Sequence, residues 1–427
     1  MADTAFGAPP DRLPRLLAGV RGEGRHLSLE EHLAVHGPLP RLGRSSPDRG
    51  LIDLIGRAGL RGRGGADFPT AVKMLAVAGG RERASVVVNG SESEPASAKD
   101  AALLRGNPHL VLDGAALAAH AVGAVDVIVA VHAREVTAVR SAVAERASRG
   151  WDSVTPAIAA MREGFVSGQE TAAVSFLNGG NGLPTFAPPR VAERGIGGRP
   201  TLVSNVETLA HIALIARHGA EWFRGLGTAD EPGSTLLTLG GAVSRPGVYE
   251  AARGAPLSGV IEQAGGATGS IQAFLIGGYE GAWVPASPGR DIALSEAGLS
   301  REGGTLGVGL ILVLPADACG LTETARIVGF LAGESAGQCG PCVHGLPALA
   351  KGMAELARGQ ARAEIVDRLA AWSWQVTGRG ACHHPDGVAR LVTSALRTFA
   401  ADAADHARRQ PCAAATRAKG SSRARVG

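Results

Sequence analysis

The order in which the apolar patterns change along the chain constrains its fold more than any single motif. From Leu51 onward, β-branched runs at residues 84–88 and 125–131 are separated by residues 110–121, which are apolar at helical spacing. Strands that alternate with helices are typical of a parallel sheet with helices on its faces. We therefore expect a Rossmann-like α/β domain over residues 47–230.

Two further changes of pattern divide the rest of the chain. Within residues 231–318, short apolar runs are punctuated by glycine pairs, which is typical of short strands joined by tight turns. Within residues 319–405, apolar residues recur at helical spacing and predict a compact helical bundle. One predicted stripe consists of Leu346, Leu349, Met353 and Leu356, and the other of Val388, Leu391, Val392 and Leu396.

The two ends of the chain are expected to lie outside these domains. Residues 1–46 form an arm with one helix at residues 27–35, which begins with the capping-box spacing of Ser28 and Glu31. Residues 406–427 are basic and rich in alanine, serine and glycine, and we expect a disordered, solvated tail. Six of the cations that contribute to the formal charge of +4 lie after Asp405, so the folded body is slightly acidic. We therefore expect no nucleic-acid-binding surface.

The apolar content is that of an ordinary globular protein. Of the 427 residues, 45% are apolar and 19% are charged. The longest apolar stretch, residues 114–133, is interrupted by His120 and Asp126, so we expect no direct insertion into a membrane. No secretory signal is recognisable, and we expect a cytoplasmic protein that is peripheral to the inner membrane only through a partner complex.

A glycine-rich loop at residues 59–65 comes just before a predicted helix. Its glycines allow backbone N–H groups to approach a phosphate or a flat ring, and the helix N-terminus adds partial positive charge. Asp67 takes the place of the third glycine of a G-x-G-x-x-G pattern. On the loop alone, nucleotide binding and an ordinary flexible turn both remain open.

A polar segment directly follows the first predicted strand, where α/β proteins place ligand groups. Asn89 offers a paired donor and acceptor, and Glu92 and Glu94 can accept hydrogen bonds from hydroxyl groups. The alternative interpretation is a polar loop with solvated carboxylates.

Four motifs in order resemble the flavin-carrying subunit of NADH:quinone oxidoreductase (complex I). They are GLRGRGGADFPT at residues 59–70, NGSESEP at 89–95, GQETA at 168–172 and PTLVSNVET at 200–208. The likeness extends over nearly the whole chain and leaves out only the termini. It implies an FMN-binding α/β domain, a small β-grasp (SLBB) domain without catalytic residues, and a helical domain with an iron-sulfur motif.

The resemblance also implies roles for individual residues. FMN or its dinucleotide partner would be bound by Gly62, Arg63, Gly64, Gly65, Phe68, Lys73, Asn89, Glu92, Gly168, Ser204, Asn205 and Thr208. NADH or NADPH would stack on the flavin, with Glu94 and Glu170 as the catalytic candidates beside it. The flavin would carry the chemistry while the protein aligns the rings and excludes water.

Four positions depart from the family pattern around this site. Asp67 replaces a glycine and Ser91 an aspartate, and both changes alter the charge near the flavin. Ala76 and Arg190 stand where aromatic rings help to hold the dinucleotide, and each lost ring forfeits about 1 kcal/mol. Arg190 can instead stack or pair with a phosphate, so NADH, NADPH and a different donor all remain open.

Three cysteines form a further motif. The run ESAGQCGPC resembles the family's cluster motif, with Cys339, Cys342 and the later Cys382 as ligands and Ala336 in place of the first cysteine. A 4Fe-4S cluster with an open or non-cysteine-bound iron, or a 3Fe-4S cluster, is therefore implied.

Other interpretations of these cysteines stay open. Zinc could use the three thiolates with His344, His383 or His384, three metal-free thiols are a second alternative, and thioredoxin-like chemistry is a third. Cys319 and Cys412 have no partner nearby in the sequence, so we expect a buried thiol and an exposed tail thiol.

Our main hypothesis is a flavoprotein that passes electrons from NAD(P)H through FMN and a cluster to a partner iron-sulfur protein. The rival is a non-catalytic scaffold that keeps the fold but has degenerate NADH and cluster sites.

Overall fold

The computed structural model describes residues 12–20, 25–40, 46–80, 82–286, 291–412 and 414–415. The chain divides into two compact units. Unit 1 comprises Met1–Leu237 and Val248–Ala255, and unit 2 comprises Thr238–Gly247 and Pro256–Gly427. Within the described ranges, no helix is long and apolar enough to cross a membrane.

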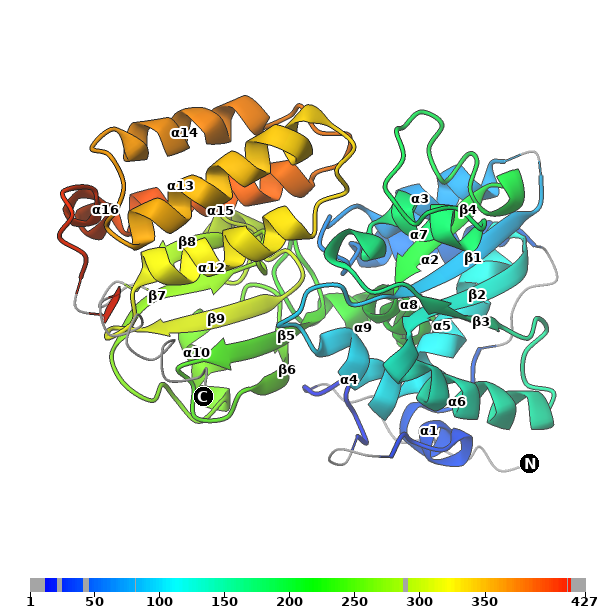
Figure 1. Ribbon diagram of the computed structural model, residues 1–427. Helices are drawn as coiled ribbons and strands as arrows, with labels where there is room; N and C mark the ends of the chain where they lie inside the picture. The colour runs from blue at the N-terminus through cyan, green and yellow to red at the C-terminus, as the bar shows by residue number, and fades with distance from the viewer. Residues whose placement is uncertain are drawn as a thin grey trace. The chain divides into compact units, whose positions relative to one another are not determined.

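Unit 1 contains a four-stranded, fully parallel sheet in the order β3-β2-β1-β4 (Figure 1). Its strands are β1 (Ala84–Gly90), β2 (Ala124–His132), β3 (Ala157–Met161) and β4 (Thr201–Asn205). Val86 and Val88 join one apolar core and Val87 joins a second, so the central strand is buried on both faces. The expected α/β domain is confirmed, with its predicted strands as β1 and β2.

Most of the other regular structure of unit 1 is α-helical. They are α1 (Leu29–His36), α2 (Arg49–Ala58), α3 (Thr70–Ala78), α4 (Lys99–Gly106), α5 (Pro108–Val122), α6 (Val136–Ser148), α7 (Glu170–Leu177), α8 (Val206–His218) and α9 (Ala220–Arg224). The Ser28 and Glu31 capping box is present at the start of α1. Helices α5 and α8 touch at Gly114, where a Cβ atom would lie 1.8 Å from the carbonyl oxygen of Leu209. Only glycine allows the two backbones to approach so closely.

A second sheet is mixed and has the strand order β6-β5-β9-β7-β8. Its strands are β5 (Ser234–Gly241), β6 (Gly247–Ala252), β7 (Ile271–Ile276), β8 (Ala282–Pro285) and β9 (Leu310–Pro315). Strands β5 and β9 are parallel, whereas β7 is antiparallel to both β8 and β9. Two short helices, α10 (Leu257–Gln263) and α11 (Glu296–Ser300), interrupt the strands, and the expected glycine-punctuated β domain is confirmed.

The C-terminal part of unit 2 is the expected helical bundle. It consists of α12 (Gly320–Gly333), a π-helical turn (Pro341–Gly345), α13 (Leu346–Ala357), α14 (Ile365–Val376), α15 (His384–Thr398) and α16 (Ala400–Ala407). All four residues of the first predicted stripe are completely buried. Of the predicted tail, the end of α16 and the residues up to Cys412 are described, whereas residues 413 and 416–427 lie outside the described residues.

Candidate functional site

The carboxyl ends of β1 and β4 bring together two motifs that are far apart in the sequence. Asn89 is paired in register with Asn205, and Val88 with Ser204. The winding of the sheet reverses here, because β2 and β3 continue on the other side of β1. Open α/β sheets bind their ligands at such a reversal, outside the carboxyl ends of the strands.

The glycine-rich loop is fastened to the same edge. The N–H of Arg63 donates to the Oγ1 atom of Thr208 on α8 over 2.8 Å, and the N–H of Gly62 donates to the carbonyl of Phe68 over 2.8 Å. Among the described residues, the N–H groups of Gly64 and Gly65 make no backbone hydrogen bond. These two groups are therefore available to an anion or a ring edge.

The GQETA motif at residues 168–172 is hydrogen-bonded to the carboxyl edge of the sheet through Asn89. The Nδ2 atom of Asn89 donates to the carbonyl of Gly168 over 2.9 Å. A Cβ atom at Gly168 would lie 2.7 Å from the carbonyl oxygen of Ser91, so glycine is required for this approach. Two residues on, Glu170 begins α7 and pairs with Lys73 of α3 over 2.9 Å. The structure thus joins a predicted flavin contact to a predicted nicotinamide contact.

Buried charges hold the strand end of β4 in place. The Oδ1 atom of Asn205 accepts from the N–H of Glu207, which caps α8, and its Nδ2 atom donates to Asp100 over 2.6 Å. Lys99 pairs with Asp100 over 2.6 Å and with Glu207 over 3.0 Å. Burial raises the pKa of Asp100 to about 6, although Lys99 opposes the shift.

Arg63 is buried, and its guanidinium contacts neighbouring residues of the protein. Its Nη2 atom donates to the carbonyl of Ser234 over 3.2 Å, and its Nε atom lies 3.8 Å from Glu207. Burial lowers the pKa of Arg63 to about 10, and the neighbouring Arg253 adds to the shift. The buried side chain of Arg63 therefore anchors the glycine-rich loop to the protein core.

Asp67 does not leave an uncompensated charge beside the loop. Its carboxylate accepts from Arg61 over 2.5 Å and from Arg253 over 3.3 Å, and it lies 3.8 Å from the guanidinium of Arg63. Its φ of +47° is in the left-handed region, which explains why a glycine fits the same position. The charge that this residue adds is neutralised locally.

The acidic segment after β1 also stabilises the local structure. Glu92 accepts from the hydroxyl of Ser97 over 2.6 Å and from the N–H of Ala101 over 3.1 Å, which caps α4. Glu94 is buried. The Oγ atom of Ser91 is also buried, and no described residue provides it with a hydrogen-bond partner. An orphaned buried hydroxyl at a ligand edge is a group that a bound molecule can satisfy.

Apolar side chains line the outer side of α3. Phe68, two residues before α3, is 49% exposed, and on the helix itself Val72 is 52% exposed and Leu75 and Ala76 are also exposed. Phe186 is exposed too, at 73%. The exposed apolar side chains on α3 and at Phe68 can cover an apolar ring, although Ala76 contributes little area.

The three motif cysteines come together in unit 2. Burial alone would raise the pKa of the Cys339 thiol, but hydrogen bonds from the N–H groups of Cys342 and Ala381 lower it overall. Burial raises the pKa of Cys342 to about 11, and the thiols of Cys339 and Cys382 add to this shift. The loop before α13 and the turn before α15 therefore bring Cys339 and Cys382 near enough to Cys342 to raise its pKa.

The histidines near these thiols differ in whether a ring nitrogen is free to bind a metal ion. Both ring nitrogens of His384 are engaged, since Nδ1 lies 2.6 Å from Glu280 and Nε2 lies 2.9 Å from the carbonyl of Leu331. The side chain of His383 is 99% exposed and pairs with Asp386 over 3.1 Å. His344 is exposed on the π-helical turn. A Cys3His zinc set that uses His384 would have to break one of these two hydrogen bonds.

Comparison with known proteins decides the family. Residues 55–214 match the Nuo51 FMN-binding domain, residues 236–272 the SLBB domain, and residues 322–406 the NADH-ubiquinone oxidoreductase-F iron-sulfur binding region. The NADH-quinone oxidoreductase F-subunit of Mycobacterium bovis is 33% identical over 371 residues, which cover 83% of each chain. The chain belongs to the family of flavin-carrying subunits of NADH-quinone oxidoreductase.

Other relatives support the assignment to the flavin-carrying subunits. The NADH-quinone oxidoreductase F-subunit 2 of Rhizobium meliloti is 31% identical over 392 residues, with 87% of this chain and 91% of the relative covered. Among solved structures, an NAD+-reducing NiFe-hydrogenase in the air-oxidized state aligns with a TM-score of 0.77 at 30% identity. The alignment covers 84% of this chain and 63% of that chain, so the hydrogenase chain is the longer of the two.

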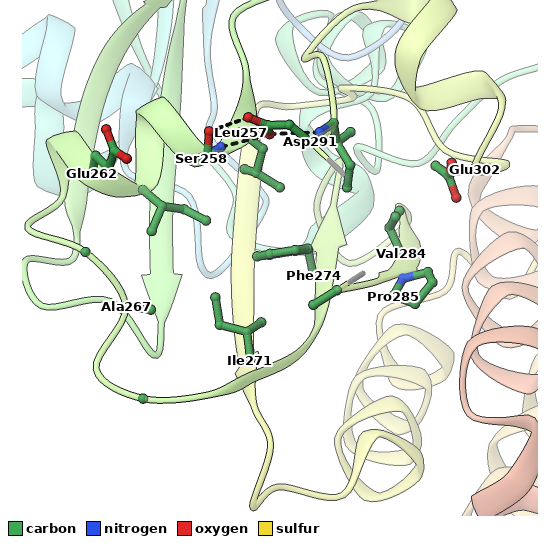
Figure 2. Close-up of a pocket in the computed structure, with 15 residues that line it drawn as sticks. Leu257, Ser258, Glu262, Ala267, Ile271, Phe274, Val284, Pro285, Asp291 and Glu302 are labelled. Carbon is green, nitrogen blue, oxygen red and sulfur yellow. Dashed lines mark hydrogen bonds between the residues drawn. The ribbon is translucent and has the colours of Figure 1, made fainter. Parts of the chain in front are cut away.

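The SLBB domain of this flavin-subunit relative has a hollow of about 650 Å³. Figure 2 shows Leu257, Ile271, Phe274 and Val284 along it, together with the hydrogen bonds between Ser258 and Asp291. The N–H of Ser258 donates to Asp291 over 3.2 Å at the start of α10, and that of Ile292 donates to it over 2.9 Å. The carboxylate is thus occupied by local backbone groups and by the hydroxyl of Ser258, and the remaining lining is mainly apolar.

Sequence reasoning missed several residues that build the sites of this flavin-subunit relative. Lys99, Asp100 and Glu207 position Asn205, yet a lysine-aspartate pair at a helix start gives no distinctive signal. Cys319 is buried, as expected, whereas the prediction of an exposed tail thiol is wrong for Cys412, which is partly buried. Both thiols lie with His406 in one group, because the chain after α16 returns to the start of α12.

Proposed function

We propose that this chain is the electron-input subunit of an oxidoreductase assembly. It binds FMN at the carboxyl edge of β1 and β4, oxidises NADH or NADPH there, and passes electrons through an iron-sulfur cluster to a partner iron-sulfur protein. Any membrane association is peripheral and occurs through that partner. The observation that carries the proposal is the meeting of the four sequence motifs at the reversal point of the parallel sheet.

The residues at this edge fit FMN. The available N–H groups of Gly64 and Gly65 suit an anion or the polar edge of a flavin ring, and the orphaned hydroxyl of Ser91 offers another polar contact. When bound, FMN supplies hydride acceptance and the release of single electrons. The ion pair of Lys73 with Glu170 fixes both side chains, and Glu94, to which the family resemblance assigns a place beside the nicotinamide, is buried.

The cysteines fit an iron-sulfur cluster in three of its four positions. Cys339, Cys342 and Cys382 would provide soft thiolate ligands, and the hydrogen bonds donated to Cys339 favour its thiolate form. Ala336 offers no ligand atom at the fourth position. We therefore expect a 3Fe-4S cluster, or a 4Fe-4S cluster with one weakly bound iron.

Purification without air tests this proposal. We expect FMN and iron in the purified chain, a flavin absorption spectrum, and ferricyanide reduction that depends on NADH or NADPH. Parallel assays with the two nicotinamides measure the preference that Arg190 would influence. A protein that lacks both flavin and iron after anaerobic reconstitution would overturn the proposal.

The second candidate function is a scaffold without catalysis. It is favoured by the ion pair of Lys73 with Glu170, which engages two predicted cofactor contacts with each other, and by the missing thiol at Ala336. Stable binding of a partner protein by a chain that holds no flavin and shows no turnover would support the scaffold.

A further inference from the structure

Three residues outside the family's motifs form a separate group of potential metal ligands. Cys319 precedes α12, His406 lies in the last turn of α16, and Cys412 follows that helix. One ligand atom from each residue lies within 4.8 Å of the other two. Cys319 and His406 are buried, while Cys412 is partly accessible, so solvent can reach the group from the side of Cys412.

Hydrogen bonds fix the orientation and tautomer of His406. Its Nδ1 atom lies 3.2 Å from the carbonyl oxygen of Leu356, and because a carbonyl only accepts, Nδ1 carries the proton. Its Nε2 atom accepts from the backbone N–H of Cys412, so it carries no proton, and it lies 4.0 Å from the Sγ atom of Cys319. Metal-binding histidines commonly have this arrangement, in which one ring nitrogen donates to a carbonyl and the other faces the ion.

The two thiols are already close enough to interact. The pKa of Cys319 is raised by burial and further by the neighbouring Cys412 thiol, while a hydrogen bond from Thr322 opposes the shift. The backbone N–H of Cys412 donates to Nε2 of His406 over 2.9 Å. An ion at the centre of the group would replace this single hydrogen bond with three ligand bonds.

We propose that Cys319, His406 and Cys412 bind a divalent zinc ion, with water in the fourth position. Two thiolates and a neutral imidazole balance the charge of the ion and are a normal ligand set for it. Binding of each ion releases one proton from each thiol, so two protons leave per ion bound. Ligation ties the residues after α16 to the start of α12.

A second group of three potential ligands, His26, His109 and Glu145 in unit 1, serves as a control. There, Glu145 accepts from His26 over 2.9 Å and from the N–H of Leu29 over 2.9 Å. These hydrogen bonds account for the position of the carboxylate without a metal.

The test uses the full chain, purified without air, loaded with zinc and washed to remove weakly bound ions. Zinc and iron are measured by elemental analysis in wild type and in the variants Cys412→Ser, His26→Gln and Cys339→Ser. We expect about one zinc per chain in wild type. Cys412→Ser should lose this zinc and keep its iron, whereas His26→Gln should keep both. Cys339→Ser should lose iron and retain zinc.

Two further measurements separate binding from misfolding. Zinc should raise the thermal midpoint of wild type but not that of Cys412→Ser, and the two metal-free proteins should melt alike. Cobalt in place of zinc should give thiolate charge-transfer absorption that is absent in Cys412→Ser. Equal zinc in wild type and Cys412→Ser would overturn the proposal. So would zinc loss only in Cys339→Ser, or a Cys319 to Cys412 disulfide in the anaerobic protein.

Discussion

The edge of the parallel sheet and the cysteine motif respond differently to departures from the family pattern. At the sheet edge, the carboxylate of Asp67 is neutralised by Arg61 and Arg253. At the cysteine motif, Ala336 removes a thiol, and the nearby His384 already has both ring nitrogens engaged. Contacts that depend on backbone groups and charge balance can be compensated by neighbours, whereas a metal ligand must itself be present.

The strongest test of compensation at the sheet edge is the buried carboxylate of Glu207. Glu207→Ala would leave Lys99 and Arg63 without their shared partner, and loss of one member of a buried ion pair costs about 3–5 kcal/mol. The free energy of unfolding from denaturant titration measures this cost. Glu221→Ala, at an exposed position on α9, is the control and should change stability by less than about 0.5 kcal/mol. An equal effect of both variants would contradict the assigned role.

Replacement of the missing thiol tests the cysteine motif directly. We expect wild type oxidised in air to show the paramagnetic resonance of a 3Fe cluster, because one iron is poorly held. Ala336→Cys should retain a 4Fe-4S cluster under the same treatment. Electron paramagnetic resonance and iron analysis distinguish the two. Identical 4Fe-4S spectra in air, or zinc in both proteins, would show that the account of a missing ligand is incorrect.

Substitution of Glu94 tests whether a nicotinamide binds at the sheet edge. Glu94→Gln preserves size and should slow flavin reduction by NAD(P)H about tenfold, the equivalent of one charged hydrogen bond, while FMN stays bound. Stopped-flow absorbance gives the rate, and fluorescence of released flavin gives the FMN content. Loss of flavin in proportion to activity would assign Glu94 to the fold or to the FMN site.

Asp67→Gly restores the family residue and tests local charge balance. Glycine removes the strain of a positive φ but also removes the partner of Arg61 and Arg253, so we expect a net stability change within about 1 kcal/mol. Thermal and denaturant unfolding of the variant measure it. A loss of more than about 3 kcal/mol would mean that the arginines depend on this carboxylate far more than an ordinary pair does.

The smallest effect should be a dependence on pH at Asp100. Burial raises its pKa to about 6 in the folded chain, above the ordinary value, so the folded state holds this proton more tightly than the unfolded state. The contribution to stability is present below the ordinary carboxyl pKa and is lost as pH rises toward 6. Asp100→Asn should flatten the stability profile in that window. A wild-type profile that rises there relative to Asp100→Asn would have the wrong sign.

The helices, the strands and the family could be predicted from the sequence, but the side-chain contacts between distant elements could not. Apolar periodicity predicted β1, β2, α5 and the buried stripe of α13, because burial repeats with the period of the element. Pairing of Lys99 with Glu207 depends on the placement of α4 against α8. The group of Cys319, His406 and Cys412 depends on how α16 returns toward α12. Periodicity contains no information about such distances between elements.

The backbone contact at Gly114 has a consequence for electron transfer. It fixes α8 within one turn of Thr208 and Asn205, the residues that connect this helix to the glycine loop and to β4. Because α8 is held in place, the dipoles around a bound flavin would stay fixed when the charge of the flavin changes. Preorganised dipoles require no rearrangement at the moment of reaction. We therefore expect Gly114, which packs against α8 next to Thr208, to help keep the reorganisation energy of the proposed flavin site low.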